Sequence, residues 1–389
     1  MKITRIDCHV LLVPEVDEGA TSSAQDDIVV EIHTDEGLTG IGESDLNPWI
    51  ARACITAPGT HTMGLGLSEM LIGQDPRQVE RLWERLYTGS AMNGRRGAVI
   101  HALGALDIAL HDLRGKAEGK PCYALLGGTP RRRITPYASL LGTGATFDGY
   151  CASIVAMATE ARRRGFRAAK LELILAGPYA HGGLQVPNGE IRTAIAAVRH
   201  AVGPEFVLMV DVGYAFADAD SCLATIREWQ EFDLFFVETP LPSDDIAGYA
   251  RLAHEQPIPI AAGEWLATRH EFRALMDDGL IAIAQPDIGR VGGLTEAKRV
   301  CDIAEARGLR IVPHAWKTGL SIAAAMHLAA VTPHCPYIEF LPADMSGSAL
   351  RRELILDEPP FRDGMIELSD RPGLGVELDR AALERYSVP

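Results

Sequence analysis

The chain has 389 residues, of which 47% are hydrophobic and 23% are charged, the composition of a globular protein with a core of useful size. The net charge of −15, the pI of about 5.3 and the lack of a basic tract argue against nucleic acid or an anionic membrane surface as a partner. No apolar run approaches the ~20 residues that a membrane-spanning helix needs.

The cysteines and the first residues of the sequence indicate the cellular compartment. The seven cysteines show no C-x-x-C spacing, so we expect reduced thiols rather than a disulfide framework. Lys2–Asp7 has the pattern of a strand and not that of a signal peptide. We therefore expect a cytoplasmic protein.

The first part of the chain mixes strand and helix patterns. Residues 1–45 alternate apolar and polar positions, which predicts antiparallel strands that include Asp27–Thr34 and Gly37–Glu43. The polar segment Glu15–Gln25 lies between two strands and is a candidate for a mobile flap. Residues 68–119 are predicted to be helical. The first ~130 residues are thus expected to form an α+β unit.

From Ile134 onward the pattern becomes a repeat of strands and helices, and Ile134–Leu140 is the first predicted barrel strand. Seven further short apolar runs follow, and each ends near an ionisable side chain. They are Arg167–Leu173, Phe206–Val212, Leu234–Thr239, Ile258–Glu264, Ile281–Asp287, Arg310–Ala315 and Tyr337–Leu341. From Asp211 onward the charges recur every 23 to 27 residues, a period that suits one strand, one helix and two loops of a (β/α) barrel.

The chain is longer than the roughly 250 residues of one barrel, so we expect further structural units. The predicted boundaries are an N-terminal α+β capping domain at 1–131, a catalytic barrel at 132–350, and a segment at 351–389 that returns to the capping domain.

Charges next to apolar strands are costly unless they serve a site. Asp211, Glu238 and Glu264 end three consecutive strands. Neighbouring strands lie about 4.8 Å apart, so the three carboxylates can converge on one cation. Oxygen ligands of this kind suit Mg²⁺. The alternative is that each carboxylate caps a helix or pairs with an arginine.

Asp287 and His314 end the next two strands. An aspartate beside a histidine fixes the imidazole tautomer and stabilises its protonated form, which makes a poised acid/base pair. Lys170 and Glu172 point to the same side of one strand. Lys170 could bind a substrate carboxylate or transfer a proton, and a plain ion pair with Glu172 is the alternative. Glu339 could hydrogen-bond an enolate oxygen if protonated, or line the wall.

These parts predict abstraction of a proton next to a carboxylate. Mg²⁺ bound to the substrate carboxylate would make the neighbouring proton more acidic, and His314 or Lys170 would remove it. The resulting enediolate could be reprotonated, could expel a β-hydroxyl, or could expel an intramolecular leaving group.

The chain resembles the mandelate racemase-type branch of the enolase superfamily over nearly its whole length. The motifs that carry the resemblance are Ala105–Gly128, the strand ends VDVGY, VETPLP and AAGEW, QPDIGRVGGLTEA, and IVPHAW. The resemblance implies a modified TIM barrel of the (β/α)7β type in the α/β class. It also implies Mg²⁺ ligands at Asp211, Glu238 and Glu264, and catalytic residues at His314, Asp287, Lys170 and Glu339.

The chain departs from the family at Glu172. Many members carry there the second lysine of a Lys-x-Lys motif, the base on the face opposite the histidine. Without it, a one-face mechanism favours dehydration of an acid sugar, an aldonate or aldarate, to a 2-keto-3-deoxy acid. The alternatives are a racemase or epimerase, a cycloisomerase, which also needs only one base face, and a barrel reused for binding alone.

Substrate contacts are predicted on loops. Family members close their pocket with two N-terminal loops, for which Glu15–Gln25 and Leu46–Cys54 are the candidates here, and the insertion Ala176–Glu190 either covers the substrate or contacts another subunit. The predicted substrate-binding residues are Glu172, Lys317, Asn47, Trp49 and His181. The polar side chains of Lys317, Asn47, His181 and Arg290 favour a polyhydroxylated carboxylate over an aromatic one, and Trp49 is a candidate either for an apolar wall or for plain packing. The resemblance also implies a homo-oligomer, a dimer or an octamer.

Overall fold

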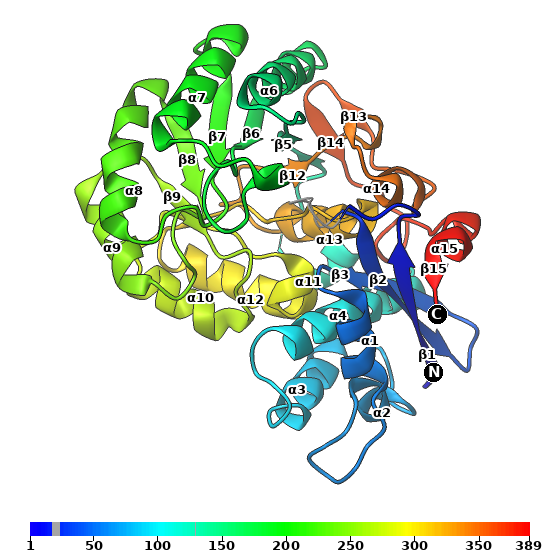
Figure 1. Cartoon of the computed structure of the whole chain (residues 1–389). Helices are drawn as coiled ribbons and strands as arrows, with labels where there is room; N and C mark the ends of the chain where they lie inside the picture. Colours follow the sequence, from blue (N-terminus) through cyan, green and yellow to red (C-terminus); the bar gives the residue numbers. More distant parts are fainter. Residues whose placement is uncertain (18–23, 129) are drawn as a thin grey trace.

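The computed structural model describes residues 1–17, 24–128 and 130–389. Figure 1 shows the strands and helices of the middle of the chain arranged as a barrel, with the N-terminal strands and helices packed against one side of it. The two ends of the chain lie close together, because the last strand, β15 (Ser387–Val388), pairs with the first strand, β1 (Ile3–Leu12). The expected flap at Glu15–Gln25 falls largely on residues 18–23, which lie outside the described residues.

The N-terminal unit is built on an antiparallel sheet with the strand order β15-β1-β2-β3. Strands β2 (Asp26–Thr34) and β3 (Thr39–Ser44) pair across a turn at Gly37, whose φ of +82° favours glycine, which confirms the predicted hairpin. Five helices follow: α1 (Pro48–Thr56), α2 (Leu67–Leu71), α3 (Val79–Gly89), α4 (Ala98–Glu118) and α5 (Cys122–Leu126).

The predicted helical stretch 68–119 consists of three helices, α2, α3 and α4. Gly73 and Gly97 adopt positive φ angles of 80° and 66° at the two breaks, and Pro76 lies in the first of them. Proline removes a helical hydrogen bond and glycine favours the left-handed turn, which accounts for both breaks.

Eight parallel strands form a curled sheet with the order β11-β10-β9-β8-β7-β6-β5-β12. The strands are β5 (Pro136–Leu141), β6 (Ala168–Glu172), β7 (Val207–Asp211), β8 (Leu234–Glu238), β9 (Ile260–Ala262), β10 (Ile283–Ala284), β11 (Arg310–Ile311) and β12 (Ile338–Phe340). The helices outside them are α6 (Phe147–Arg163), α7 (Asn188–Val202), α8 (Ala219–Ile226), α9 (Ile246–Glu255), α10 (Thr268–Asp277), α12 (Gly293–Glu305) and α13 (Gly319–Ala330), with the short α11 (Ile288–Val291) before α12. Short 3₁₀ turns lie at His181–Gly183, Arg227–Phe232 and Ala343–Met345. This is the predicted barrel class.

The first barrel strand differs from the prediction. It begins at Pro136, whereas Arg133–Ile134 forms a separate strand, β4, that pairs with β14 (Met365–Glu367). The chain changes sheets at Thr135 because proline has no N–H to donate and holds the preceding residue in an extended conformation.

The chain after β12 returns along the molecule. It contains α14 (Ala349–Glu353), the β13 (Phe361–Arg362) and β14 hairpin, α15 (Arg380–Tyr386) and β15, which completes the N-terminal sheet. The domain boundaries at 131/132 and 350/351 stay a prediction. None of the helices in the described ranges has the length and apolarity that crossing a bilayer requires.

Inside the barrel, each strand contributes side chains in two layers. The lower layer is apolar and contains Tyr137, Ala168, Met209, Phe236, Ala261, Ile283 and Val312. Two residues further along seven of the strands, toward their carboxyl ends, the inward positions hold Ser139, Lys170, Asp211, Glu238, Gln285, His314 and Glu339, all buried. Side chains two apart on a strand share a face. The polar layer therefore lies directly above the apolar layer inside the barrel.

His327 on α13 joins α5 to the C-terminal segment through two hydrogen bonds. Its Nδ1 accepts a hydrogen bond from the Tyr123 N–H at 3.2 Å, and its Nε2 bonds the Leu374 carbonyl at 3.0 Å. The ring is buried, and burial lowers its pKa to about 4. The neutral ring therefore fits the site and the charged ring does not.

We predict that the stability of the protein falls as the pH drops from about 6.5 to about 4, because the unfolded chain binds a proton that folded His327 refuses. His327→Gln should flatten this fall by about 1 kcal/mol per pH unit, measured by urea unfolding between pH 7 and 5. His200→Gln, on the exposed side of α7, is the control. An unchanged slope in His327→Gln would assign the acid sensitivity to other groups.

Candidate active site at the carboxyl ends of the barrel strands

Lys170 lies at the centre of the polar layer and is 1% exposed. Its Nζ donates to Glu238 Oε1 at 2.9 Å and lies 3.1 Å from Glu339 Oε1, 3.3 Å from Glu172 Oε1 and 3.7 Å from Asp211 Oδ2. The Lys170–Glu172 contact that the sequence left open is thus one of four close contacts with carboxyl groups. Burial would lower the pKa of Lys170, but Glu172, Glu238 and Glu339 outweigh it and raise the pKa well above its usual value.

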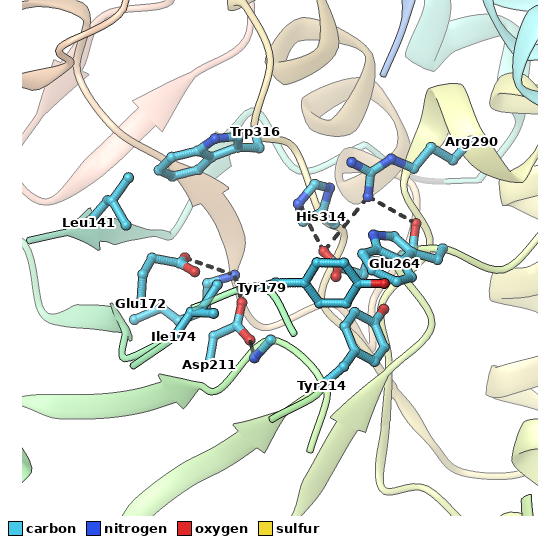
Figure 2. A pocket seen from close by; sticks show the side chains of 13 residues that line it. Leu141, Glu172, Ile174, Tyr179, Asp211, Tyr214, Glu264, Arg290, His314 and Trp316 are labelled. Carbon is cyan, nitrogen blue, oxygen red and sulfur yellow. Dashed lines mark hydrogen bonds and ion pairs between the residues drawn. The ribbon is translucent and has the colours of Figure 1, made fainter. Parts of the chain in front are cut away.

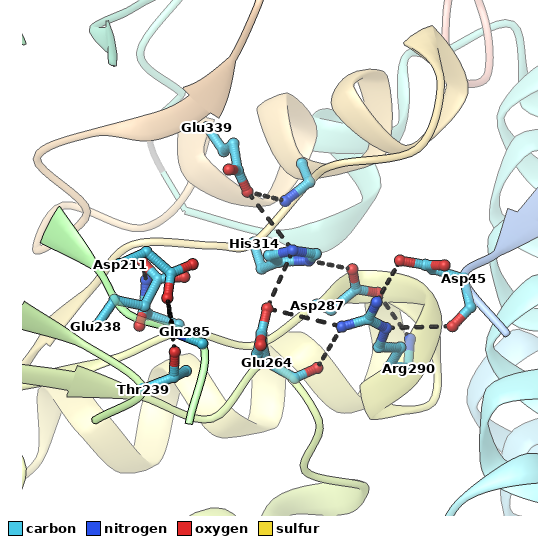
Figure 3. A network of polar contacts seen from close by, with 12 residues as sticks. Asp45, Asp211, Glu238, Thr239, Glu264, Gln285, Asp287, Arg290, His314 and Glu339 are labelled. Atoms are coloured by element: carbon cyan, nitrogen blue, oxygen red, sulfur yellow. Dashed lines mark hydrogen bonds and ion pairs between the residues drawn. The ribbon is translucent and has the colours of Figure 1, made fainter. Parts of the chain in front are cut away.

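Asp211 and Glu238 are held by neighbours on one oxygen each. Asp211 Oδ1 accepts hydrogen bonds from the Gly213 N–H at 2.8 Å and from Thr239 Oγ1 at 2.7 Å. Glu238 Oε2 accepts from Gln285 Nε2 at 2.6 Å. In both residues the other oxygen lies on the side of Lys170. Figure 3 shows Asp211 and Glu238 next to Thr239 and Gln285. Burial raises the pKa of Glu238 to about 8, which outweighs the opposite effect of Lys170.

His314 lies between two carboxylates. Its Nδ1 is 2.7 Å from Asp287 Oδ2, and its Nε2 is 3.1 Å from Glu264 Oε2 (Figure 3). Asp287 is itself fixed, because its Oδ1 accepts from the Arg290 N–H at the start of α11. Burial alone would lower the pKa of His314, but Glu339, Glu264 and the Asp287 hydrogen bond outweigh it and raise the pKa to about 9. The imidazole is therefore oriented and holds its second proton readily.

Ser139 joins the two remaining carboxyl groups. Its Oγ lies 2.8 Å from Glu172 Oε1 and 2.6 Å from Glu339 Oε1, yet a hydroxyl has one proton to donate. One of the carboxyls must therefore be protonated for both hydrogen bonds to form. Burial raises the pKa of Glu172 well above its usual value. For Glu339, burial is outweighed by Lys170, His314, Ser139 and the Ala315 N–H, which lower its pKa to about 2. Of the two carboxyls, Glu172 is the one whose pKa is raised, so it takes the proton more readily and Glu339 is the better acceptor.

The donor set can be tested for its fit to a divalent cation. Among the described residues, no three acidic, histidine or cysteine side chains lie together closely enough to hold an ion as they stand, because Glu264 turns toward His314 and Arg290. The chemistry of the donors nevertheless fits, since Asp211, Glu238 and Glu264 are buried carboxylates at the ends of neighbouring parallel strands. Carboxylate oxygens are the ligands that Mg²⁺ takes from proteins.

A cavity of about 180 Å³ opens above the polar layer (Figure 2). Its charged part consists of Lys170, Glu172, Asp211, Glu264, Arg290 and His314. The rest of its wall is Leu141, Ile174, Gly213, Tyr179, Tyr214, Trp265 and Trp316. In Figure 2, Glu172 and Leu141 lie on the side of the cavity away from His314 and Arg290.

Of the five predicted substrate contacts, Glu172 lines this cavity and the other four do not. Asn47 caps α1 by accepting from the Ile50 N–H, so the expected loop Leu46–Cys54 is largely that helix. Trp49 lies on the exposed side of α1. His181 packs 5.5 Å from the Tyr150 ring, and Lys317 is buried in ion pairs with Asp26 and Asp45.

The aromatic residues that line the cavity were not predicted from the sequence, although a local signal existed. Tyr214, Trp265 and Trp316 follow Asp211, Glu264 and His314 by one to three residues, which places them on the turns that leave the strand ends. Tyr179 comes from the insertion Ala176–Glu190. This insertion therefore contributes to the cavity wall.

Two family models match the chain. The model described as "Mandelate racemase / muconate lactonizing enzyme, N-terminal domain" matches residues 4–127, and "Enolase C-terminal domain-like" matches residues 153–382. The chain belongs to the mandelate racemase/muconate lactonizing enzyme family of the enolase superfamily, and it is an enzyme of that superfamily.

Individual relatives span the same length. A D-galactarolactone cycloisomerase of Agrobacterium fabrum is 33% identical, with 100% of both chains covered. An L-rhamnonate dehydratase of Saccharopolyspora erythraea is 30% identical over 90% of this chain and 83% of its own. The crystal structure of a racemase from Streptomyces coelicolor with bound magnesium has a TM-score of 0.84 at 26% identity, covering 99% of this chain and 100% of that chain.

Asp45 ties the N-terminal unit to the cavity. It is buried between two cations: Arg290 bonds both its carboxylate and, at 3.1 Å, its carbonyl oxygen, and Lys317 Nζ lies 3.0 Å from its Oδ1 (Figure 3). Burial alone would raise the pKa of this carboxyl, but Arg290 and Lys317 lower it.

We predict that Asp45→Asn lowers the free energy of unfolding by about 3 kcal/mol, because it leaves Arg290 and Lys317 buried side by side without their shared anion. Asp26→Asn is the matched control, since Asp26 also contacts Lys317 but is partly exposed and does not contact Arg290. Urea unfolding of the two variants measures the difference. If both variants lose the same free energy of unfolding, the contacts of Asp45 with Arg290 and Lys317 contribute no more than a surface ion pair.

Proposed function

We propose that the protein catalyses Mg²⁺-dependent abstraction of the proton α to a carboxylate, and that the reaction is dehydration of an acid sugar, an aldonate or aldarate, to a 2-keto-3-deoxy acid. The observation that carries the proposal is the pairing of His314 with Asp287 at 2.7 Å, in a cavity that also holds Lys170 and a set of buried carboxylates. An oriented imidazole beside a cluster of carboxylates that can hold a cation is what α-proton abstraction requires.

Asp211, Glu238 and Glu264 would hold the Mg²⁺. When bound, Mg²⁺ supplies positive charge that stabilises the negative charge developing on the substrate carboxylate. The chain's own part is to orient the acid sugar and to move the protons. His314 lines the cavity and Asp287 fixes its Nδ1, so the neutral form of His314 takes the α-proton on Nε2 and returns it to the departing hydroxide. Lys170 Nζ donates hydrogen bonds to the oxygen that gains charge.

Glu172 favours a mechanism on one face of the carbon. A racemase needs a competent base on each face, and Glu172 lies on the side of the cavity away from His314. It shares its hydrogen bonds with Lys170 and Ser139, and burial keeps its proton on. A protonated carboxyl cannot accept the α-proton, which supports dehydration over racemisation.

Cycloisomerisation is the second candidate. Expulsion of an intramolecular oxygen also needs a base on one face only, so Glu172 fits it equally well. A relative that covers the whole chain is named a D-galactarolactone cycloisomerase, and others are named L-rhamnonate and D-galactonate dehydratases. The two reactions differ in whether water is lost.

We predict that a library of acid sugars with Mg²⁺ contains a substrate that gives a semicarbazide-reactive ketone, and that His314→Asn lowers its turnover by about 10³-fold. Mg²⁺ affinity and the melting temperature should stay near the wild-type values, because Asn keeps one hydrogen-bonding group. His254→Asn, on the exposed face of α9, is the control. Near-normal turnover in His314→Asn would remove His314 from the mechanism, and α-deuterium uptake without ketone across the library would replace dehydration by an isomerisation.

We predict that Glu238→Gln weakens Mg²⁺ binding about tenfold or more, since it removes one negative charge from the proposed ligands. Calorimetric titration with Mg²⁺ alone measures the affinity. Glu296→Gln is the matched control, because Glu296 is equally buried but binds Arg269 and Arg299 outside the cavity. Unchanged affinity in Glu238→Gln would discard the ligand assignment.

We further propose that the protein works in the cytoplasm on a small-molecule carboxylate and assembles as a homo-oligomer, a dimer or an octamer, as its family resemblance implies. All seven cysteines are free thiols, which supports a reducing compartment.

A further inference from the structure

Two chemically different groups of side chains line the cavity. Six of them are ionisable, whereas the other side chains are those of Leu141, Ile174, Tyr179, Tyr214, Trp265 and Trp316. Apart from the tyrosine hydroxyls and the tryptophan ring N–H groups, the side chains of this second group have nothing with which to bond a sugar hydroxyl. The part of the substrate that lies beyond its carboxylate therefore meets a largely apolar surface.

Three of these rings form one aromatic wall, which consists of Tyr179, Tyr214 and Trp265. Tyr214 stacks on Trp265 with 4.0 Å between ring centroids and 27° between planes. Tyr179 stands edge-on to both, at 6.3 Å from Tyr214 and 5.2 Å from Trp265. The rings come from three different loops, after β6, β7 and β9, so their convergence is a product of the barrel and not of local sequence.

Part of this wall has a strained backbone conformation, which a hydrogen bond holds in place. Tyr214 has a φ of +61°, the left-handed region that side chains other than glycine rarely adopt. The conformation is held by a hydrogen bond from the Tyr214 N–H to the Thr239 carbonyl at 2.6 Å, and it brings the ring onto Trp265. Strain of this kind persists where the surrounding structure fixes it and is concentrated at ligand sites.

The wall also remains accessible. Trp265 is 41% exposed and Tyr179 is 47% exposed, although both line a cavity that also contains six ionisable side chains. Pockets that bind small molecules combine an apolar, aromatic surface with a few placed polar groups. The ligand that fits here carries a carboxylate at one end and a flat apolar face at the other.

An open-chain polyol does not have such a face. In an extended chain the hydroxyl groups point to both sides, and a hydroxyl pressed against an aromatic ring loses its hydrogen bonds to water without replacement. A closed ring gathers C–H groups on a face that packs on an aromatic ring.

We propose that the protein binds its acid sugar as a ring, a lactone or a cyclic ether bearing one carboxylate, with a C–H face of the ring against the aromatic wall. Trp265 and Tyr179 are then specificity-determining residues that select closed over open forms. This inference rests on the proposed function for the nature of the substrate, but the preference for a ring can be measured without turnover.

Two unreactive acids of the same size test the proposal. Tetrahydropyran-2-carboxylate is closed, and 2-methoxypentanoate is open and carries the same ether and carboxylate groups. Their affinities for the Mg²⁺-loaded enzyme are measured by calorimetry. We expect the wild-type enzyme to bind the ring about fivefold more tightly, the size of one aromatic contact.

Substitutions in the aromatic wall test whether it causes the preference for the ring. Trp265→Leu should abolish the preference for the ring, and Tyr179→Leu should reduce it. Trp49→Leu is the matched control, because Trp49 is also 41% exposed but lies outside the cavity, and it should keep the preference. Equal affinity of the two acids for the wild-type enzyme, no binding of either, or an intact preference in Trp265→Leu would overturn the proposal.

The test separates this inference from the proposed function. A ring preference that depends on Trp265, found together with no α-deuterium uptake by any acid sugar, would support the aromatic wall and reject the proposed reaction. Turnover of acid sugars, found together with equal affinity for the ring acid and the open-chain acid, would support the proposed reaction and reject the role of the aromatic wall.

Discussion

The arrangement of the site depends on one buried cation. Lys170 lies within 3.7 Å of carboxylate oxygens from four residues on four strands, Glu172, Asp211, Glu238 and Glu339. Carboxylates that are buried this deeply repel one another and lose hydration, so they stay ionised only near compensating positive charge. Lys170 supplies part of that charge, and the Ser139 hydroxyl bridges Glu172 and Glu339. A divalent cation at Asp211, Glu238 and Glu264 would relieve the remaining repulsion.

The described part of the N-terminal unit contributes to the site through charge. Asp45, at the end of β3, binds Arg290, which lines the cavity, and Lys317, which does not. Glu43 on the same strand accepts hydrogen bonds from Thr318 and Ser321 at the start of α13. The two contacts fix the N-terminal sheet against the loops that follow β10 and β11. Lys317 therefore serves to join the units, although its place next to His314 in the sequence suggested a substrate contact.

The sequence predicted those parts of the site that depend on strand periodicity. An ionisable residue at the end of each apolar run has its direction set by the alternation of side chains along a strand, and parallel strands bring their carboxyl ends to one edge of the sheet. That argument brought Lys170, Asp211, Glu238, His314 and Glu339 to one layer, where the structure has them. It did not apply to Asn47, Trp49 and His181, because these lie on helices and turns whose direction is set by packing.

The sequence by itself determined the class of fold, the carboxyl-end layer of charged residues and the pairing of Asp287 with His314, since each follows from a repeat length or a period of two along a strand. Only the tertiary structure decided which charges compensate one another and what covers the rest of the cavity. Glu172 becomes a protonated partner of Ser139 only because four strands pack around Lys170. Three separate loops had to converge before Tyr179, Tyr214 and Trp265 became one wall. These contacts join residues that are far apart in the chain, and no local pattern specifies the distance or the angle at which such residues meet.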